Sequence, residues 1–408
     1  MNIKEIVLIT SAFPYEPGEQ FLETEVNYWG QQENINFTIL PCSKSEVIRE
    51  VPSNIKVNDI LCINNFTLFQ KVKYFMKVFD SMLLYRELKY ILSKPIVLPI
   101  AIKSIAKVLF YKELLESYIK KNDKELIFYT YWHNESTYAL QLLNNKYNIK
   151  VVTRTHGHDL YEERRKFHYM PLRRQLLGHL DKIFTITNNA ESYIVNQYGF
   201  NSSIIETSKL GVNEYGIVAR KSEEKHFSIV SCSFLVEVKR VDKLLLALQK
   251  LAKLHKTVSI QWTHIGDGPL RKTLENLARS ENNSENLKIN FIGHLNNKDV
   301  YGFYKANPVD VFINVSESEG APVSIMEAMS CGIPIVAPNV GGISDMVIDK
   351  FNGILLSSNA TANDIADALL NIDFFKKETI RKNSYMIYKE KYDAKKNYSE
   401  FISKLMKL

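Results

Sequence analysis

Short runs of β-branched residues alternate with longer helical patterns along most of this chain. Such alternation predicts βαβ units, in which parallel strands form a sheet and helices cover its faces. In the first half, strands are expected at residues 5–10, 37–41, 126–131, 151–155 and 182–187. In the second half, they are expected at residues 228–232, 259–265, 288–292, 311–315 and 334–337. Two sets of strands predict two doubly wound α/β domains.

The length of the chain agrees with this division. It has 408 residues, more than one ordinary domain of about 150 residues. The polar stretch 213–226 separates the two sets of strands and indicates a linker. We therefore expect an N-terminal domain at residues 1–212 and a C-terminal domain at residues 227–385. Residues 386–408 are expected to form a helix that returns to the N-terminal domain.

The composition excludes several classes of protein. Hydrophobic residues make up 45% of the chain and charged residues 24%, which rules out disordered, collagen-like and disulfide-scaffold classes. The four cysteines form no CxxC pair and are expected to be free thiols in a reducing compartment. The start lacks a secretory signal pattern. The longest apolar run, residues 95–102, is shorter than the roughly 20 residues of a membrane-spanning helix. We expect a cytoplasmic protein.

Residues 66–121 interrupt the alternation and predict two helices separated by Pro95 and Pro99. Apolar side chains three and four positions apart form one face of the first helix. They are Phe69, Val72, Met76, Phe79 and Leu83. The lysines that lie off this face are Lys71, Lys73 and Lys77. Two interpretations stay open: a surface helix packed on its own sheet, or a basic surface for an anionic membrane or a lipid-linked acceptor.

The net charge of +7 is concentrated in this insertion. Residues 66–121 hold eleven Lys and Arg against four Asp and Glu, and the rest of the chain balances at 41 of each sign. This local excess favours the membrane interpretation, with peripheral contact at the inner face of the cell membrane. No basic stripe with a recognisable nucleic-acid module is present, so nucleic acid is not expected as a partner.

The segment 316–329 follows a predicted strand, at the edge of a parallel sheet where ligands bind. Gly320 allows a tight turn there, and Pro322 is suited to the first position of a helix. The backbone N–H groups of Ala321 and Val323 would then point outward from the start of that helix. A helix start of this kind binds anions and suits a diphosphate.

Two carboxylates bracket this helix start. Glu319 lies before the helix, and Glu327 lies a little over one turn into it. An isolated helical glutamate is usually a solvated surface residue. Here the position beyond a strand and the helix start together favour a ligand site. Both carboxylates are expected to accept hydrogen bonds from sugar hydroxyls.

The spacing from Glu319 to Glu327 resembles the E-x7-E motif of the retaining glycosyltransferases of family GT4. Further stretches that match this family are 13–19, 155–159, 210–212, 266–269, 331–337 and 341–345. The resemblance implies the GT-B fold, in which two doubly wound Rossmann-like domains face each other across a cleft. It also implies transfer of a sugar, with retention at the anomeric carbon, from a nucleotide sugar that we expect to be UDP-linked. The acceptor would be a hydroxyl of a glycan, a polyol-phosphate polymer or a lipid-linked molecule in bacterial surface polysaccharide synthesis.

The resemblance assigns roles to three residues of the second half. Glu319 would hold the donor sugar, Glu327 the ribose hydroxyls, and Lys239 the donor phosphates. A lysine suits the last role, because its mobile charge can follow the charge that builds on the leaving diphosphate. Glu319 and Lys239, together with His156 of the first half, are therefore the expected catalytic residues.

The chain departs from the family pattern near Lys239. The family usually has an arginine five or six residues before this lysine, where this chain has Phe234 and Ser233. Either Arg240 compensates for the missing arginine or the phosphate clamp is weaker than usual. Ser233 and Arg240 are counted among the expected diphosphate-binding residues.

Four further positions are expected to contact substrate. His156 matches the family's crevice histidine, whose neutral ring could donate to a sugar hydroxyl. Gly18 follows the first strand, where a glycine lets backbone approach the donor phosphates or the acceptor. Gly293 and His294 lie where the family holds the base through main-chain contacts.

The resemblance implies a reaction on one face of the sugar, with the leaving phosphate accepting the proton of the acceptor. No pair of carboxylates in a recognisable hydrolase motif occurs in the first half. No Asp-x-Asp sequence occurs in the chain. We therefore expect neither a metal ion nor a cofactor.

Two other functions stay open, and a third is less favoured. A nucleotide-sugar epimerase of the same architecture would release nucleotide without an acceptor. A nucleotide- or glycan-binding protein with weak catalysis is conceivable because of the missing arginine. A dehydrogenase is less favoured than either, because the stretch 266–271 lacks the third glycine of the dinucleotide fingerprint.

Overall fold

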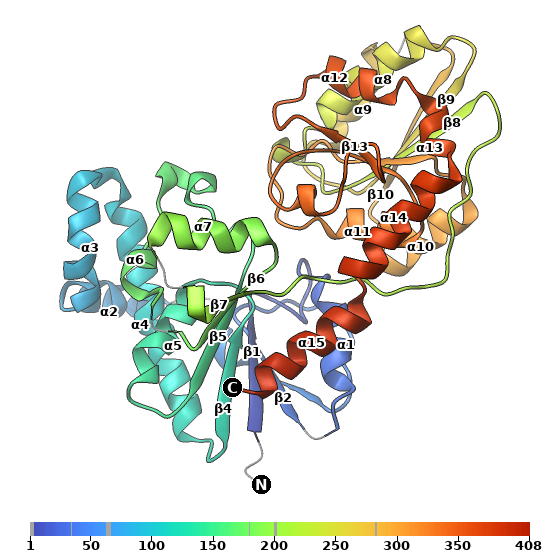
Figure 1. Ribbon diagram of the computed structural model, residues 1–408. Coiled ribbons are helices and arrows are strands. Elements are labelled where there is room, and N and C mark those ends of the chain that lie inside the picture. Colours follow the sequence, from blue (N-terminus) through green and yellow to red (C-terminus); the bar gives the residue numbers. More distant parts are fainter. Residues whose placement is uncertain (1–3, 34, 63–66, 179, 200–201, 282–283) are drawn as a thin grey trace. The chain divides into compact units, whose positions relative to one another are not determined.

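The computed structural model describes residues 4–33, 35–62, 67–178, 180–199, 202–281 and 284–408. The chain divides into two compact units (Figure 1). Unit 1 comprises the residues up to Ser208 together with Tyr398–Leu408, and unit 2 comprises Lys209–Asn397. No helix among the described residues has the length and apolar character needed to cross a bilayer.

Unit 1 is built on a parallel sheet that has seven strands within the described residues, in the order β3-β2-β1-β4-β5-β6-β7. The strands are β1 (Lys4–Thr10), β2 (Asn36–Pro41), β3 (Ile55–Val57), β4 (Glu125–Thr130), β5 (Lys150–Thr155), β6 (Lys182–Thr185) and β7 (Ile205–Thr207). All five strands expected in this half are present. Sequence reasoning missed β3 and β7, because a three-residue strand is too short to show an alternating pattern.

The helices of unit 1 are α1 (Leu22–Gly30), α2 (Leu68–Phe79), α3 (Met82–Ser93), α4 (Leu98–Lys120), α5 (Glu135–Asn144), α6 (Arg173–Leu176), α7 (Asn188–Tyr198) and α15 (Ala394–Met406). Helices pack on both faces of the sheet. Alternate residues of β1 enter two separate cores: Val7 packs in a core with α4 and α5, and Leu8 in a core with α1 and α15. Phe401 of α15 is fully buried in the second core. The expected return of the C-terminal helix to the N-terminal domain is therefore confirmed. The expected single helix over 386–408 is divided, because residues up to Lys391 belong to α14 (Glu378–Lys391) and α15 begins at Ala394.

The insertion differs from the two helices expected between residues 66 and 121. It forms three helices, because the chain breaks at Asp80 and Ser81, and the Ser81 hydroxyl caps α3 by accepting from the Leu83 N–H at 3.2 Å. The expected boundary at the prolines is present as well: Pro95 begins a short 3-10 turn between α3 and α4, and Pro99 lies in the first turn of α4. Residue 66 is outside the described residues.

The expected apolar face is also split. Phe69, Val72, Met76 and Phe79 are exposed on α2, whereas Leu83 is buried in α3. The prediction that this face packs on the sheet is therefore wrong. The apolar spacing continues through residues 79–83, so periodicity alone could not reveal that two helices share it.

Unit 2 contains a second parallel sheet, six-stranded over its described residues, in the order β10-β9-β8-β11-β12-β13. The strands are β8 (His226–Cys232), β9 (Ser259–Ile265), β10 (Leu287–Gly293), β11 (Val311–Ile313), β12 (Ile335–Pro338) and β13 (Gly353–Leu356). The helices are α8 (Val241–Leu254), α9 (Arg271–Glu281), α10 (Asn297–Ala306), α11 (Val323–Ser330), α12 (Ala362–Leu369), α13 (Ile372–Lys376) and α14 (Glu378–Lys391). The five expected strands are confirmed, and β13 was missed.

The strand order positions the ligand site of unit 2. From β8 the chain proceeds outward through β9 and β10, then returns to pair β11 on the other side of β8. The direction in which successive strands are added to the sheet therefore reverses between β8 and β11. Ligands of open parallel sheets bind at such switch points, beyond the carboxyl ends of the strands. Two doubly wound domains, as expected, are confirmed.

A buried ion pair in unit 1 leads to a stability prediction. Arg154 of β5 donates to Glu25 of α1 at 2.6 Å, and both side chains are at most 1% exposed. The Arg154 guanidinium also lies 4.0 Å from the centre of the Phe401 ring. Changing Glu25→Ala leaves a buried charge without its partner and should lower the free energy of unfolding by about 3–5 kcal/mol in urea titration.

The matched control is Glu23→Ala on the same helix. Glu23 pairs with Arg49 at 2.9 Å but keeps 41% of its side chain exposed, so its loss should cost less than about 1 kcal/mol. Equal effects of the two substitutions would contradict the importance of the buried pair.

Candidate active site

Two loops meet at the switch point of unit 2. One follows β8 and contains Lys239, and the other follows β11 and contains Glu319. The backbone N–H of Glu317 donates to the carbonyl of Val238 at 2.9 Å. This bond ties the two loops together, although about eighty residues separate them in the chain.

The structure brings the predicted residues Lys239 and Glu319 into direct contact. Lys239 Nζ donates to Glu319 Oε1 at 2.7 Å, and Asn314 Nδ2 donates to the same oxygen at 3.0 Å. Asn314 is itself held, because its Oδ1 accepts from the Ser316 N–H at 2.9 Å. Glu319 is buried and Lys239 is partly exposed. Sequence reasoning missed Asn314, which carries no signal apart from its position at the end of β11.

A glycine explains why the Glu319 backbone can lie where it does. Gly341 has a φ of +57°, and a Cβ on it would stand 1.9 Å from the Glu319 carbonyl oxygen. The next residue, Gly342, donates its N–H to the carbonyl of Gly320 at 2.8 Å. Any side chain at position 341 would push the Glu319 loop away, so Gly341 supports the site through its backbone.

The helix α11 begins one residue later than expected. Pro322 lies at the N-cap, and Val323 is the first helical residue. Ala321 and Pro322 are buried, and Val323 is partly exposed. Since the first-turn N–H groups of a helix have no partner within the helix, this start keeps the character of an anion site.

Glu327 lies on the buried side of α11. It is 5% exposed, and burial raises the pKa of its carboxyl from 4.5 to about 8. The helix backbone at this point is held by Ser330, whose hydroxyl donates to the Glu327 carbonyl at 2.7 Å. Glu327 is therefore mainly protonated at neutral pH.

The loop that carries Ser233 is fastened to the ends of β9 and β10. Ser233 donates its N–H to the Ile265 carbonyl at 3.0 Å, and Gly266 donates to the Gly293 carbonyl at 2.8 Å. Gly266 has a φ of +138°, and a Cβ on it would stand 2.0 Å from the Ser233 carbonyl oxygen. Close backbone approach therefore requires glycine at the start of the 266–269 stretch.

A buried hydrogen-bond chain that sequence reasoning missed supports the same loop. The Trp262 indole donates to Ser231 Oγ at 2.9 Å, Ser231 Oγ lies 2.8 Å from His264 Nδ1, and His264 Nε2 lies 3.1 Å from the Ser233 carbonyl. Burial lowers the pKa of His264 to about 4, so the ring is neutral. A carbonyl only accepts, so Nε2 carries the proton and Nδ1 accepts from Ser231.

Two arginines stand near the expected phosphate site, and both are paired with carboxylates. Arg240 binds Asp242 at 3.1 Å and also contacts Glu317. Arg271 donates to Asp267 at 2.9 Å. A Cβ added to Gly293 would stand 3.1 Å from Arg271, which places this arginine beside the expected base-binding backbone. Sequence reasoning missed Arg271.

The remaining expected positions of unit 2 differ in exposure. Gly293 is buried with a φ of +83°, which favours glycine, and His294 is exposed. Phe234, at a position where the family usually has arginine, is 59% exposed.

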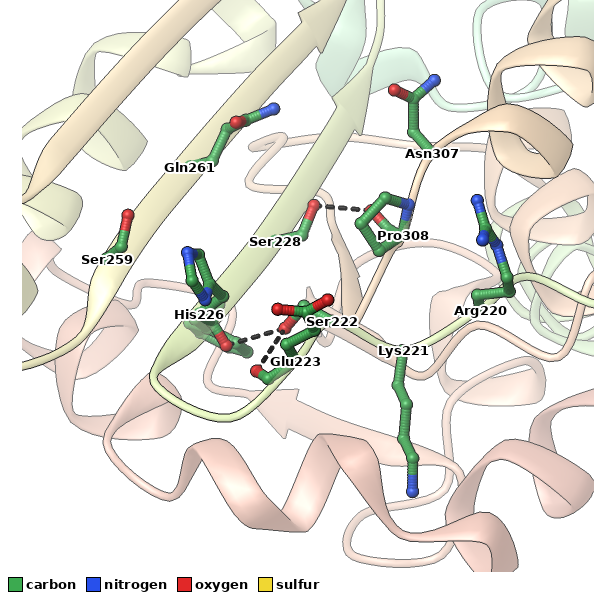
Figure 2. A pocket seen from close by; sticks show the side chains of 11 residues that line it. Arg220, Lys221, Ser222, Glu223, His226, Ser228, Ser259, Gln261, Asn307 and Pro308 are labelled. Atoms are coloured by element: carbon green, nitrogen blue, oxygen red, sulfur yellow. Dashed lines mark hydrogen bonds between the residues drawn. The ribbon is translucent and has the colours of Figure 1, made fainter.

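A separate hollow of unit 2 lies at the opposite end of the strands (Figure 2). It is lined by residues near the amino ends of β8 and β9, including His226 and Ser259. Its Ser228 hydroxyl donates to the Pro308 carbonyl at 2.7 Å. The hollow contains none of the predicted site residues, which lie at the carboxyl ends of the strands.

In unit 1, His156 lies at the end of β5 against two aromatic rings. Its ring centre is 4.5 Å from that of Tyr131 and 4.6 Å from that of Trp132. Burial, assisted by the charge of Arg154, holds the pKa of His156 well below 6.5, so the ring is neutral. Among the described residues, neither ring nitrogen has a hydrogen-bond partner, although both are buried. Such unpartnered nitrogens are costly unless a ligand binds them.

Asp159 fixes the backbone on both sides of this ring. One carboxylate oxygen accepts from the His156 N–H at 2.6 Å, and the other from the His133 N–H at 2.7 Å. Arg173 donates to the carbonyls of Asp159 and His133. The ends of β4 and β5 are therefore held together, and this gives the 155–159 stretch a positioning role.

The Gly18 loop folds onto a carboxylate of the chain itself. Glu19 accepts from the backbone N–H groups of Ser11, Ala12 and Phe13, at 3.0, 2.6 and 2.7 Å, and from the Trp132 indole. Gly18 is exposed with a φ of +101°, a conformation that requires glycine. Sequence reasoning missed the role of Glu19. Its carboxylate joins the loop after β1 to Trp132, one of the two aromatic residues that contact His156.

Comparisons with known proteins agree with this architecture. Residues 217–389 match the family model of Glycosyl transferases group 1, and residues 78–214 match that of Glycosyltransferase Family 4. Together the two matches cover about three quarters of the chain. The chain belongs to the GT4-type glycosyltransferases. The family resemblance drawn from the sequence motifs is confirmed.

Relatives of this glycosyltransferase extend the comparison. An uncharacterized glycosyltransferase of Methanocaldococcus jannaschii is 28% identical over 57% of this chain and 60% of its own length. The O-antigen biosynthesis glycosyltransferase WbnH of Escherichia coli is 36% identical over 25% of this chain and 26% of its own length. The chain thus spans three fifths or less of these relatives.

Solved structures share the fold over nearly the full length. A lipopolysaccharide outer core galactosyltransferase, WaaB, superimposes with a TM-score of 0.70 at 16% identity, over 98% of this chain and 99% of that one. Anabaena HepE, in complex with UDP and glucose, gives a TM-score of 0.65 at 14% identity, over 99% and 100%. At these identities the likeness shows the GT-B fold alone.

The raised pKa of Glu327 leads to a prediction for stability. Between pH 4.5 and about 8 the folded protein keeps the Glu327 proton, whereas the unfolded chain releases it. The free energy of unfolding should therefore fall as the pH rises through this window. Glu327→Gln removes this contribution, so its stability relative to wild type should rise from pH 5 to pH 8 in thermal unfolding.

The exposed Glu285→Gln serves as the matched control and should follow wild type at every pH. A constant difference between Glu327→Gln and wild type from pH 5 to pH 8 would show that Glu327 is ionised in the folded protein.

Proposed function

We propose that this chain transfers a sugar, with retention, from a UDP-linked sugar to a hydroxyl in the assembly of a bacterial surface polysaccharide. The acceptor would be a glycan, a polyol-phosphate polymer or a lipid-linked molecule. HepE was solved with UDP and glucose, and WbnH acts in O-antigen biosynthesis. These relatives support the donor and acceptor classes.

The observation that carries the proposal is the contact between Lys239 and Glu319 at the switch point. Lys239 Nζ lies 2.7 Å from the Glu319 carboxylate, which holds the cation in place. A cation held in place before the substrate arrives stabilises charge without first having to reorganise. We assign Lys239 to the leaving diphosphate and Glu319 to the hydroxyls of the donor sugar.

The rest of the donor would extend over neighbouring groups of unit 2. The start of α11, with Ala321, Pro322 and Val323, would face the diphosphate through backbone N–H groups. Glu327 would accept from the ribose hydroxyls, and backbone at Gly293 and His294 would hold the base. Arg240 would leave its partners Asp242 and Glu317 and bind the donor phosphate. Ser233 would be a further diphosphate-binding residue.

Breaking the bond from the anomeric carbon to the phosphate leaves negative charge on the diphosphate. The acceptor oxygen attacks the same face of the sugar, and its proton passes to the departing phosphate oxygen. The chain contributes charge stabilisation and orientation. His156, neutral and with unpartnered ring nitrogens, would donate to a sugar hydroxyl, and the Gly18 loop would approach the donor or acceptor.

We also propose that the protein works at the inner face of the cell membrane. A lipid-linked acceptor would be presented there, and residues 66–121 carry the whole net positive charge of the chain. Anionic lipid attracts such a segment.

A panel of nucleotide sugars, scored by nucleotide release with and without candidate acceptors, tests the proposed function. Acceptor-dependent release from a UDP-sugar is expected. Lys239→Ala should reduce that turnover by about 100-fold or more, because one preorganised charge is lost, while thermal unfolding stays close to wild type. The exposed Lys253→Ala is the matched control.

The other outcomes are informative. Release of nucleotide and conversion of the donor without acceptor would identify an epimerase. Binding without release would identify a binding protein. Wild-type turnover of Lys239→Ala would refute the role of this lysine.

The absence of an Asp-x-Asp sequence leads to a prediction about metal ions. Transfer should continue at an unchanged rate in EDTA, because Lys239 and the helix start take the place of a divalent cation at the diphosphate. The measurement is turnover after dialysis against EDTA, with and without added Mg²⁺. A loss that Mg²⁺ restores would contradict it.

A further inference from the structure

Helix α2 presents a continuous apolar face to solvent. All twelve of its residues are described, and six large apolar side chains among them are exposed. These are Leu68, Phe69, Val72, Phe75, Met76 and Phe79, with Leu68 and Phe69 each 78% exposed. At 100° per residue they fall within one third of the helix circumference. Single exposed apolar side chains are ordinary, but six on three turns mark an interaction surface.

The outward direction of this face is fixed by contacts on the other side of the helix. Tyr74 and Val78 are buried against α4. The Tyr74 ring meets Phe110 edge to face at 5.2 Å, and its hydroxyl donates to Glu113 at 2.7 Å. Lys73 also reaches Glu113, at 3.2 Å. Rotation of α2 to hide the apolar face would break all of these contacts.

The charges around the face indicate what covers it. In α2 there are three lysines and no acidic residue. By helical position Lys71 borders one side of the apolar face and Lys73 the other, with Lys77 beyond it. The pattern of an apolar face with lysine borders is that of helices that lie in the interface of an anionic bilayer.

The next helix continues the pattern. On α3, Met82, Tyr85 and Leu92 are exposed together with Arg86 and Lys89. Both helices lie beyond α4, at the margin of unit 1 (Figure 1). Cationic and apolar groups mixed on one margin fit lipid headgroups and acyl chains, whereas a protein groove would need acidic side chains at many matching points.

We propose that α2 is an interfacial membrane anchor. It lies parallel to the plane of an anionic bilayer, its six apolar side chains enter the acyl boundary, and its lysines contact the headgroups. This inference deepens the membrane contact proposed above. It does not depend on the chemistry of sugar transfer.

Co-sedimentation with vesicles tests the anchor. The full-length protein is mixed with vesicles of phosphatidylcholine containing 30% phosphatidylglycerol, and with pure phosphatidylcholine vesicles. Wild type should bind the anionic vesicles and bind the neutral ones more weakly. Phe69→Ser combined with Phe75→Ser should weaken binding to anionic vesicles by about tenfold or more, because two large apolar groups no longer leave water.

The control is Val218→Ser combined with Leu254→Ser, two exposed apolar residues of unit 2, which should bind like wild type. Lys71→Glu combined with Lys89→Glu should abolish the preference for anionic vesicles. Lys73 and Lys77 are avoided because their contacts with Glu113 help to hold α2.

Two results would overturn the anchor. One is equal vesicle binding by wild type and the Phe69/Phe75 variant. The other is concentration-dependent self-association of wild type, without vesicle binding, that the variant loses; the face would then be an interface between two copies. Nucleotide release with a water-soluble acceptor should be unchanged in all variants. Absence of nucleotide release by wild-type protein that still binds anionic vesicles would count against the proposed transfer and not against the anchor.

Discussion

Parallel pairing of β8 with both β9 and β11 is the constraint on which the candidate site depends. It forces the loops after β8 and β11 to leave the same edge of the sheet as neighbours. The backbone bond between Glu317 and Val238 then joins these loops, and Lys239 meets Glu319 at 2.7 Å. The ion pair is a consequence of the strand order. The same order, read at β9 and β10, places the Gly266 and Gly293 backbones beside it.

Burial sets the protonation of the key groups. Glu327 keeps its proton at neutral pH because its carboxyl is enclosed, and His156 stays neutral because two aromatic rings and Arg154 surround it. His264 is neutral for the same reason, and its hydrogen bonds decide which nitrogen carries the proton. These three side chains therefore carry no charge at neutral pH.

Much of the fold and the centre of the site were predictable from sequence. Ten strands were placed correctly, because each lies within a recognisable run of apolar and β-branched residues. The pair Glu319 and Glu327 was recognisable because a local spacing carries it. The three-residue strands β3 and β7, and the break at Asp80, were not predictable, because their signals are as weak as those of ordinary loops. Sequence reasoning missed three residues of the site, Asn314, Glu19 and His264. Each forms hydrogen bonds with backbone groups or with side chains distant in sequence, and such bonds leave no local pattern.

The sequence by itself determined the alternation of strands and helices, the residues that can carry charge at the switch point, and the concentration of positive charge in residues 66–121. These properties are local, so spacing and composition express them. Two features follow from tertiary contacts alone. Glu19 accepts from the backbone N–H groups after β1 and is held there by Trp132, and the apolar face of α2 points to solvent because the opposite face packs on α4. These partners are distant in sequence, so only folding brings them near.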